Sequence, residues 1–142
     1  MTHLTPEEKS ELIRQALAAR EYAVAPYSNF LVGAALRAAD GRVYTGCNIE
    51  NAAYSPTNCA ERTALFKAVS EGVTHFTDIA IVGAKRGQVN ELVTAPCGVC
   101  RQALYEFCGP ELNVIMAKTP TDYLERSLGE LLPFGFGGAN IL

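Results

Sequence analysis

The sequence predicts an α/β protein, in which a mixed central β-sheet lies between helical layers in a three-layer α/β/α arrangement. Amphipathic helical segments alternate with short apolar runs in the order α-β-β-α-β-α-β-α, an alternation typical of α/β folds. The composition, with 49% hydrophobic and 19% charged residues over 142 positions, is that of a folded chain and excludes a disordered one. We expect residues 1–142 to form a single domain without repeats or linkers.

The first predicted element is a helix over residues 5–23. Thr5 can cap this helix, Pro6 suits its first position, and Glu8 completes a capping box. Apolar residues then recur at helical spacing. Pro26 prevents the helix from continuing.

The remaining elements follow from turn signals and apolar runs. Asp40-Gly41 separates two such runs and predicts a β-hairpin of strands 31–38 and 43–47. The next segment, 58–71, has helical spacing and ends before Gly72. Four further elements are expected: a buried strand at 79–82, a helix at 98–108, a buried strand at 113–117 and a short helix between Ser127 and Pro133.

Charge and cysteine content limit the function classes. The net charge is −3, whereas proteins that bind phosphates usually carry the opposite sign, so we expect neither nucleic acid nor an anionic membrane as a partner. No signal peptide is visible, and no run approaches the roughly 18 apolar residues of a membrane helix. The five cysteines are odd in number and indicate free or metal-bound thiolates in a reducing cytoplasm.

Three of the cysteines form a candidate metal site. Cys97 and Cys100 make a Cys-x-x-Cys motif, and Cys59 stands at the start of the second predicted helix. A redox motif would need a thioredoxin-like context, but no strand leads directly into this one. A structural zinc site would need a fourth ligand; the candidates are His3, His75, Cys47 and Cys108. Three thiolates without an obvious fourth ligand favour a catalytic zinc site with one position left for water.

Two charged residues next to Cys59 fit this interpretation. Helix starts favour the thiolate form of cysteine, and Arg62 can offset the net negative charge of three thiolates and one Zn²⁺. Elsewhere Arg62 would simply be a surface arginine, and Glu61 a favourable charge in the first turn of a helix. Beside an activated water, however, Glu61 can accept a proton and deliver it. Cys47 and Cys108 lack such neighbours and are interpreted as small hydrophobic residues.

Four motifs together point to one family. They are Pro26-Tyr27-Ser28-Asn29-Phe30-Leu31-Val32-Gly33-Ala34-Ala35-Leu36, Gly46-Cys47-Asn48-Ile49-Glu50-Asn51-Ala52, Cys59-Ala60-Glu61-Arg62-Thr63-Ala64 and Pro96-Cys97-x-x-Cys100. In these motifs the sequence resembles the zinc-dependent cytidine deaminases, in particular their short, homotetrameric type. The resemblance extends over nearly the whole chain. The cysteine signature and the role of its glutamate are established for zinc deaminases as a class.

The resemblance implies one Zn²⁺ per chain and hydrolytic deamination of cytidine and 2′-deoxycytidine to uridine, 2′-deoxyuridine and ammonia, in pyrimidine salvage. It implies that Cys59, Cys97 and Cys100 bind the zinc, that Glu61 shuttles the proton, and that Arg62 hydrogen-bonds to the thiolates. For the substrate, it implies that Asn48 and Glu50 bind the ribose hydroxyls, that Phe30 packs beside the pyrimidine, and that the backbone of Ala60 addresses the base edge.

The resemblance also implies a homotetramer whose subunits share active sites. Phe136 would close the pocket of a neighbouring subunit, with Ala52 and Tyr54 near the same junction, although Phe134 is a second candidate for closing it. From the residues alone, the uncharged segment 131–142 is expected to bury itself either against its own domain or at a subunit interface.

Three other functions remain open at this stage. A deaminase of an aminonucleoside antibiotic, of the blasticidin S type, would share the zinc chemistry, but Phe30 and the Asn48-x-Glu50 pair favour a plain nucleoside. Side chains two apart at a strand end share one face, so this pair can recognise sugar hydroxyls. A tRNA or single-stranded DNA deaminase is disfavoured by the acidic charge and by Cys59, where histidine is more usual. A structural zinc module would have a closed, four-ligand site.

Overall fold

The sheet is mixed, as the sequence predicts. The computed structural model describes residues 4–89 and 91–142, and its five strands lie in the order β2-β1-β3-β4-β5. β3 and β4 run parallel, and the other neighbouring pairs run antiparallel. The strands are β1 (Phe30–Ala38), β2 (Val43–Cys47), β3 (Phe76–Lys85), β4 (Asn113–Thr119) and β5 (Asp122–Ser127).

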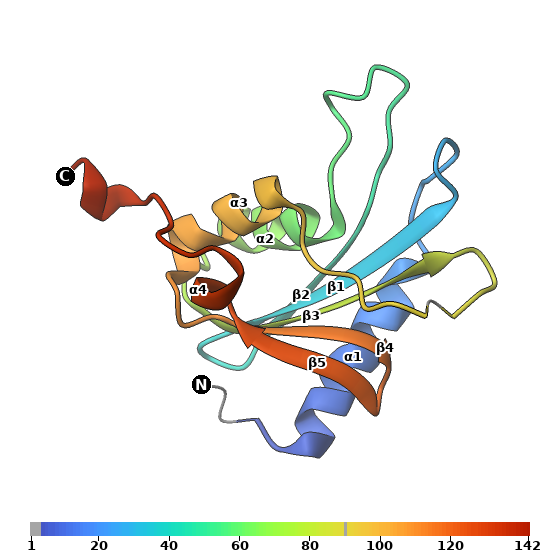
Figure 1. Ribbon diagram of the computed structural model, residues 1–142, viewed down its shortest axis with the longest axis horizontal. Coiled ribbons are helices and arrows are strands. Elements are labelled where there is room, and N and C mark those ends of the chain that lie inside the picture. Colours follow the sequence, from blue (N-terminus) through green and yellow to red (C-terminus); the bar gives the residue numbers. More distant parts are fainter. Residues whose placement is uncertain (1–3, 90) are drawn as a thin grey trace.

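Helices cover both faces of this sheet (Figure 1). The first helix lies on one face, and the next three lie on the other, so the three-layer α/β/α expectation is confirmed. The α-helices are α1 (Pro6–Arg20), α2 (Ala60–Ser70), α3 (Gly98–Cys108) and α4 (Leu128–Leu131), and a 3₁₀ turn, η1 (Gly138–Asn140), lies near the C-terminus. In the described part of the chain, none of the helices combines the length and apolar character needed to cross a bilayer.

Successive strand residues contribute to two separate cores. Leu36 belongs to the core under α2 and α3, where it joins Leu65 and Leu104. Its neighbour Ala35 points to the opposite face and joins Ile13 of α1. This alternation follows from the two-residue period of a β-strand, and it explains why the central strands are apolar on both faces over most of their length.

Local sequence signals place several element boundaries correctly. The capping box is present: the hydroxyl of Thr5 accepts from the backbone N–H of Glu8, and the Glu8 carboxylate accepts from the backbone N–H of Thr5. Gly72 follows α2 with φ +86°, and Gly41 turns the hairpin with φ +93°, both in the left-handed region that glycine tolerates. The bounds of β2 and α3 agree with the expected ranges.

Other boundaries were wrong, for identifiable reasons. α1 ends at Arg20 and not at residue 23, because the N–H groups of Tyr22 and Ala23 bond to carbonyls three residues back in a tightened last turn. α2 starts two residues later than expected, since Asn58 pairs with Ile49 in an isolated bridge. β3 extends well beyond 79–82 at both ends, and β5 was not expected at all.

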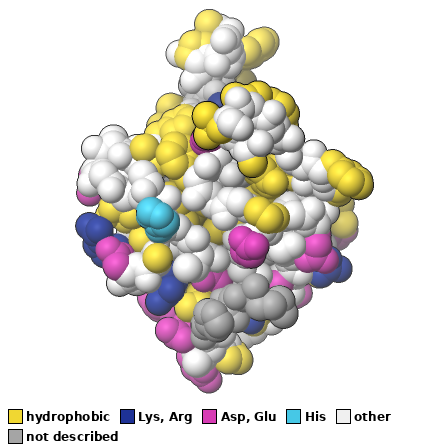
Figure 2. All heavy atoms as spheres, turned by 90° about the vertical axis from the view of Figure 1, so that its left-hand side faces the viewer, with side chains coloured by type: hydrophobic (Ala, Val, Ile, Leu, Met, Phe, Trp, Pro, Cys, Tyr) yellow, Lys and Arg dark blue, Asp and Glu magenta, His cyan; other side chains and the backbone are white. Residues whose placement is uncertain are grey.

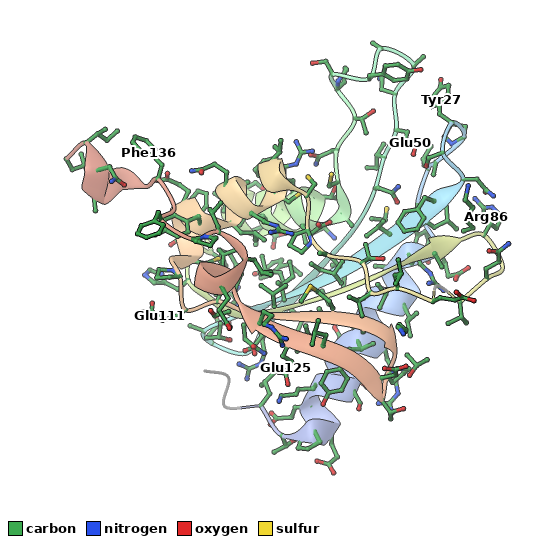
Figure 3. The ribbon with its side chains drawn as sticks, in the orientation of Figure 1. Tyr27, Glu50, Arg86, Glu111, Glu125 and Phe136 are labelled. Carbon is green, nitrogen blue, oxygen red and sulfur yellow. The ribbon has the colours of Figure 1, made fainter. Side chains whose placement is uncertain are left out.

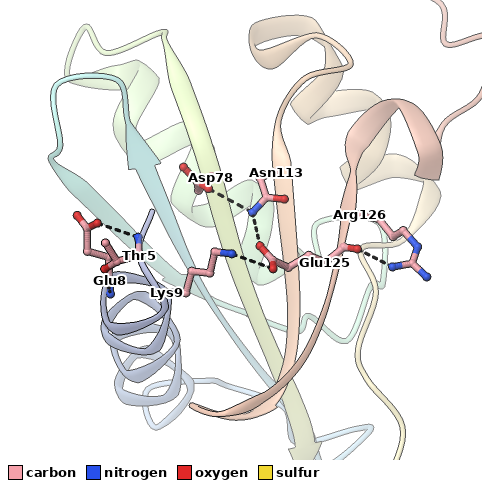
Figure 4. A network of polar contacts seen from close by, with 7 residues as sticks. All are labelled: Thr5, Glu8, Lys9, Asp78, Asn113, Glu125 and Arg126. Atoms are coloured by element: carbon pink, nitrogen blue, oxygen red, sulfur yellow. Dashed lines mark hydrogen bonds and ion pairs between the residues drawn. The ribbon is translucent and has the colours of Figure 1, made fainter. Parts of the chain in front are cut away.

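A network of polar side chains links β5 and α1 to the neighbouring strands of the sheet (Figure 4). The buried side chain of Asn113 donates to Asp78 (3.3 Å) and to Glu125 (2.9 Å), and Lys9 forms an ion pair with Glu125 (3.0 Å). Asp78 is 1% exposed, so its carboxylate depends on such donors for the hydrogen bonds that water would otherwise supply. Asn113 therefore links strands β3, β4 and β5 through side chains as well as through backbone.

We predict that Asn113→Ala lowers the free energy of unfolding by about 1–3 kcal/mol, because the buried carboxylate of Asp78 and the partly buried one of Glu125 each lose a donor. The matched control is Arg126→Ala, whose exposed guanidinium bonds only to the adjacent carbonyl of Glu125; we expect a change within about 0.5 kcal/mol. Urea denaturation of the zinc-loaded variants at one protein concentration measures both. Equal urea midpoints for the two variants would contradict the role given to Asn113.

Candidate metal centre and active site

The site lies at one end of the sheet, where the start of β1 lies between the ends of β2 and β3. Phe30 begins β1 and pairs with Lys85, the last residue of β3, while Cys47 ends β2 opposite Gly33 near the start of β1. The segments that follow β2 and β3 therefore emerge beside the start of β1. These segments lead to α2 and α3, whose first turns carry the candidate zinc ligands.

The three predicted cysteines converge there. Cys59 is the N-cap of α2, Cys97 is the N-cap of α3, and Cys100 lies in the first turn of α3. The sulfur atoms of Cys59 and Cys97 are 3.8 Å apart, those of Cys97 and Cys100 are 3.5 Å apart, and all three lie within 4.8 Å of one another. Tetrahedral zinc with Zn–S bonds of about 2.3 Å needs sulfurs about 3.8 Å apart, so the donor set and its spacing fit Zn²⁺.

Close packing of α2 on β2 positions Cys59. A Cβ added to Gly46 would lie 2.4 Å from the carbonyl oxygen of Ala60 and 2.5 Å from the backbone nitrogen of Ala64. No side chain fits in this space, so glycine allows the first turn of α2 to rest directly on the strand. Ala60 is consequently fully buried, and Cys59 and Glu61 on either side of it are held at the sheet edge.

No fourth histidine or cysteine joins the cluster among residues 4–89 and 91–142. Cys47 lines a separate cavity of about 450 Å³ between α1, β2 and α2. Burial raises the pKa of Cys108 to about 12, as expected for a thiol that packs as a small apolar group. His75 lies at the opposite end of β3, before Phe76, and His3 falls outside the described residues. Within the described ranges, therefore, Cys47, Cys108 and His75 do not supply the fourth ligand of a closed structural site.

Arg62 lies against the thiolates, as the sequence predicts. Its guanidinium donates to the sulfur of Cys59 at 3.3 Å. Burial works to lower the pKa of Arg62, but hydrogen bonds to Cys59 and Cys100 outweigh it and raise that pKa. The pKa of Cys59 is lowered, to about 5, by hydrogen bonds from Cys100 first and from Arg62 next. The environment of Cys59 therefore favours the thiolate that a metal requires.

Glu61 is buried beside the cluster, with 3% of its surface exposed. Burial raises the pKa of Glu61 to about 7, and the charge of Cys59 acts in the same direction. A carboxylate with a pKa near neutrality can both accept and donate a proton at working pH, which is the property of a general acid–base group. Burial and like charge are the usual causes of such a shift at active sites.

Asn48 and Glu50 follow the end of β2 and bind the start of β1 and the turn before it. The amide of Asn48 donates to the carbonyl of Phe30 (2.8 Å) and accepts from the N–H of Val32 (2.9 Å). The carboxylate of Glu50 accepts from backbone N–H groups of Tyr27 and Ser28. Both side chains therefore reach the same corner of the sheet, at the start of β1.

Phe30 and the loop after β2 surround this corner. The ring of Phe30 covers Gly83 on β3, where a Cβ would lie 3.0 Å from the ring carbons. Ala52 and Tyr54 lie in the loop that projects from the top of the molecule in Figure 1, and both are exposed. Tyr54 meets Tyr27 edge to face, with ring centroids 6.4 Å apart. A cavity of about 290 Å³ opens between the two loops, lined by Tyr27, Ser28, Glu50, Asn51, Tyr54 and Thr57.

Phe136 is not brought to this corner within the chain. Figure 3 shows Phe136 and Glu50 at opposite ends of the molecule. The backbone around Phe136 packs on its own domain: Gly135 and Gly137 rest on the ring of Tyr105, and Gln102 donates to the carbonyl of Phe136. The side chains of Phe134 and Phe136 are left outward and exposed. The backbone of the uncharged tail thus packs against its own chain, whereas the side chains of Phe134 and Phe136 stay exposed in the single chain.

One residue near the site was missed at the sequence level. Ser28 donates its hydroxyl to the carboxylate of Glu50, 22 positions further along the chain. The available signal was its place in the motif Pro26-Tyr27-Ser28, but a serine beside a proline is also an ordinary turn residue. Only the tertiary contact distinguishes the two roles.

Taken together, the arrangement is that of a metal-assisted hydrolytic site. Three thiolates at two helix starts can hold a zinc ion with one position open, and a buried carboxylate that titrates near neutrality lies next to them. The polar side chains of Asn48 and Glu50 bond to the start of β1 and to the turn before it. Such a site can add water to an electrophilic carbon.

Comparison with known proteins agrees with a metal-assisted hydrolytic site. The family model described as the cytidine and deoxycytidylate deaminase zinc-binding region matches residues 6–116. The cytidine deaminase of Sporosarcina psychrophila is 51% identical over 126 residues, 89% of either chain, and that of Halalkalibacterium halodurans is 47% identical over 129 residues, 91% of this chain and 94% of its own. The chain belongs to the zinc-binding cytidine and deoxycytidylate deaminase family.

Solved structures show the same fold. The crystal structure of cytidine deaminase from Burkholderia pseudomallei has a TM-score of 0.82 and 48% identity, covering 96% of this chain and all of that one. Cytidine deaminase from Mycobacterium tuberculosis has a TM-score of 0.76 and 41% identity, covering 89% of this chain and 95% of its own. The mixed sheet with helices on both faces is therefore the fold of the family.

Proposed function

We propose that the chain catalyses hydrolytic deamination of cytidine and 2′-deoxycytidine, giving uridine or 2′-deoxyuridine and ammonia, as one catalytic domain of pyrimidine salvage. The observation that carries the proposal is Glu61, a buried carboxylate that titrates near neutrality beside three cysteines with zinc spacing. Relatives that cover most of the chain are named cytidine deaminases, which supports cytidine as the substrate. The net charge of −3 supports a free nucleoside over nucleic acid.

In this reaction, separate residues would hold the metal and transfer the protons. Cys59, Cys97 and Cys100 would hold one Zn²⁺, which when bound supplies a Lewis acid that makes a water molecule acidic near neutral pH. The Glu61 carboxylate takes a proton from the attacking water and delivers it to N3 of cytosine, so that C4 becomes electrophilic. The water oxygen bonds to C4, and Glu61 then carries the remaining proton of that oxygen to the amino nitrogen. The C4–N bond breaks, ammonia leaves, and the C4 carbonyl of uridine forms.

Other residues would support the zinc ligands and would bind the base and the sugar. Arg62 would stabilise the thiolate of Cys59 and so keep the ligand set charged. Phe30 would pack beside the pyrimidine, and the backbone of Ala60 would address its edge. Asn48 and Glu50 would bind the sugar hydroxyls. Polar groups that a bound sugar covers would reject analogues that leave them without a partner.

Glu61→Gln is expected to retain one zinc per chain and to lower the rate of ammonia release from cytidine by about 10²- to 10⁴-fold, the usual contribution of a general acid–base group. The amide keeps the shape of the side chain but cannot carry the proton. The measurement is kcat from ammonia release, with zinc quantified in the same samples.

Glu71→Gln is the matched control, since Glu71 is exposed at the far end of the same helix; it should leave kcat unchanged. A zinc-loaded Glu61→Gln variant with a near-normal rate would contradict the proton-carrying role. A zinc-loaded wild type that releases no ammonia from cytidine would instead point to a modified cytosine nucleoside of the antibiotic type.

We further propose that the chain works in the cytoplasm, which keeps its thiols reduced, and that it assembles as a homotetramer with shared active sites. The uncharged tail supports the assembly, since Phe134 is fully exposed and Phe136 is 56% exposed in the single chain. Figure 2 shows hydrophobic side chains gathered in the upper part of the face that carries the tail, with charged side chains mostly below them. An exposed apolar face of this kind is typical of an interaction surface.

A chain that ends at Pro133 is expected to run as a smaller species than the full chain in size-exclusion chromatography with light scattering, and to lose most of its activity on cytidine. The removed segment carries the exposed Phe134 and Phe136 side chains that the assembly would bury. Val89→Ser, which alters an exposed apolar residue outside the tail, serves as control and should keep the native size. A truncated chain of unchanged size and activity would overturn the interface role.

A further inference from the structure

The carboxylate of Glu50 is held by a turn that precedes it by more than twenty residues. Its Oε1 atom accepts from the backbone N–H groups of Tyr27 (3.0 Å) and Ser28 (3.1 Å), and its Oε2 atom accepts from the Ser28 hydroxyl. Figure 3 shows Glu50 directed towards the turn that carries Tyr27. All three of these donors come from the short segment between α1 and β1.

These bonds leave the Glu50 carboxylate with one free acceptor position. An ionised carboxylate has about four acceptor positions, and Oε1 already uses both of its own. On Oε2 the Ser28 hydroxyl occupies one position, so a single acceptor position remains for a ligand. The same hydroxyl accepts from the N–H of Phe30 at 3.0 Å, which directs its proton towards Glu50. Together with the two backbone N–H groups on Oε1, the Ser28 hydroxyl thus orients the free position on Oε2.

The same serine joins the two halves of the substrate site. Through its bond from the N–H of Phe30 it is linked to the residue proposed to lie beside the base, and through Glu50 to the group proposed for the sugar. Asn48 ties to the same stretch of β1, at Phe30 and Val32. The Ser28 hydroxyl lowers the pKa of Glu50, as a hydrogen bond to a charged carboxylate does.

We propose that Ser28 is a positioning residue for the sugar of the substrate: its hydroxyl orients the Glu50 carboxylate so that the one free lone pair of Oε2 receives a sugar hydroxyl. Ser28 makes no contact with the reacting atoms in this role. The inference rests on the proposed function, since it concerns the sugar end of the nucleoside site. It separates orientation of the carboxylate, supplied by Ser28, from the bond to substrate, supplied by Glu50.

The test compares two substrates that differ only in the sugar. With cytidine, Ser28→Ala should lower kcat/KM about ten-fold, mainly through a higher KM, because a bond to a charged group and the orientation it gives are lost. With 2′,3′-dideoxycytidine, which lacks both ring hydroxyls, the same variant should stay within about two-fold of wild type. Ser28→Thr keeps a hydroxyl and should recover most of the activity on cytidine.

Two further variants distinguish positioning from damage to the fold. In a Glu50→Ala background, Ser28→Ala should have no additional effect, since its only route to the sugar has been removed. Ser70→Ala removes an exposed serine hydroxyl at the end of α2, away from the site, and should match wild type on both substrates. Zinc content and assembly are measured for each variant.

An equal loss on both substrates would overturn the proposal, because it would show a general structural role for the turn. An unchanged kcat/KM for cytidine would also overturn it. Wild-type enzyme that fails to deaminate cytidine would overturn the proposed function and this inference together. That outcome is distinct from the first two, in which the wild type remains active.

Discussion

Three sulfur atoms within 4.8 Å of one another are the feature on which the rest of the site depends. As thiolates they repel each other, and the chain compensates in two ways. Cys59 and Cys97 each cap a helix N-terminus, where backbone N–H groups face negative charge, and the guanidinium of Arg62 bonds to Cys59. A divalent cation supplies the remaining compensation, so that metal binding and local folding of the two helix starts are coupled.

The topology of the sheet brings these groups together. Antiparallel pairing places the start of β1 beside the ends of β2 and β3, so the segments that lead to α2 and α3 emerge at one edge. Gly46 then allows α2 to approach β2 closely enough to bury Glu61 next to Cys59. Burial raises the pKa of Glu61, and the same burial excludes the water that would otherwise stabilise its charge.

Much of this architecture could be predicted from the sequence, because local sequence patterns determine it. The bounds of β2 and α3 followed from turn and helix signals, and the three-cysteine set followed from motif spacing. β5 was missed because Asp122–Ser127 is a partly exposed edge strand in which three of six residues are charged and no apolar run occurs. The sheet pairing of Asp78 was missed for a similar reason: a buried aspartate in a strand needs tertiary donors, and one of them is Asn113, 35 positions away. Ser28 depends on a tertiary contact in the same way.

The central claim is an open zinc site with three sulfur ligands, and X-ray absorption at the zinc edge of the loaded protein tests it most directly. The open site should give three sulfur neighbours at about 2.3 Å and one lighter donor atom. A Cys100→Ala variant should lose bound zinc, whereas Cys108→Ala should give the wild-type spectrum, since Cys108 lies outside the cluster. Four sulfur neighbours in the wild type would indicate a closed structural site and would contradict the account.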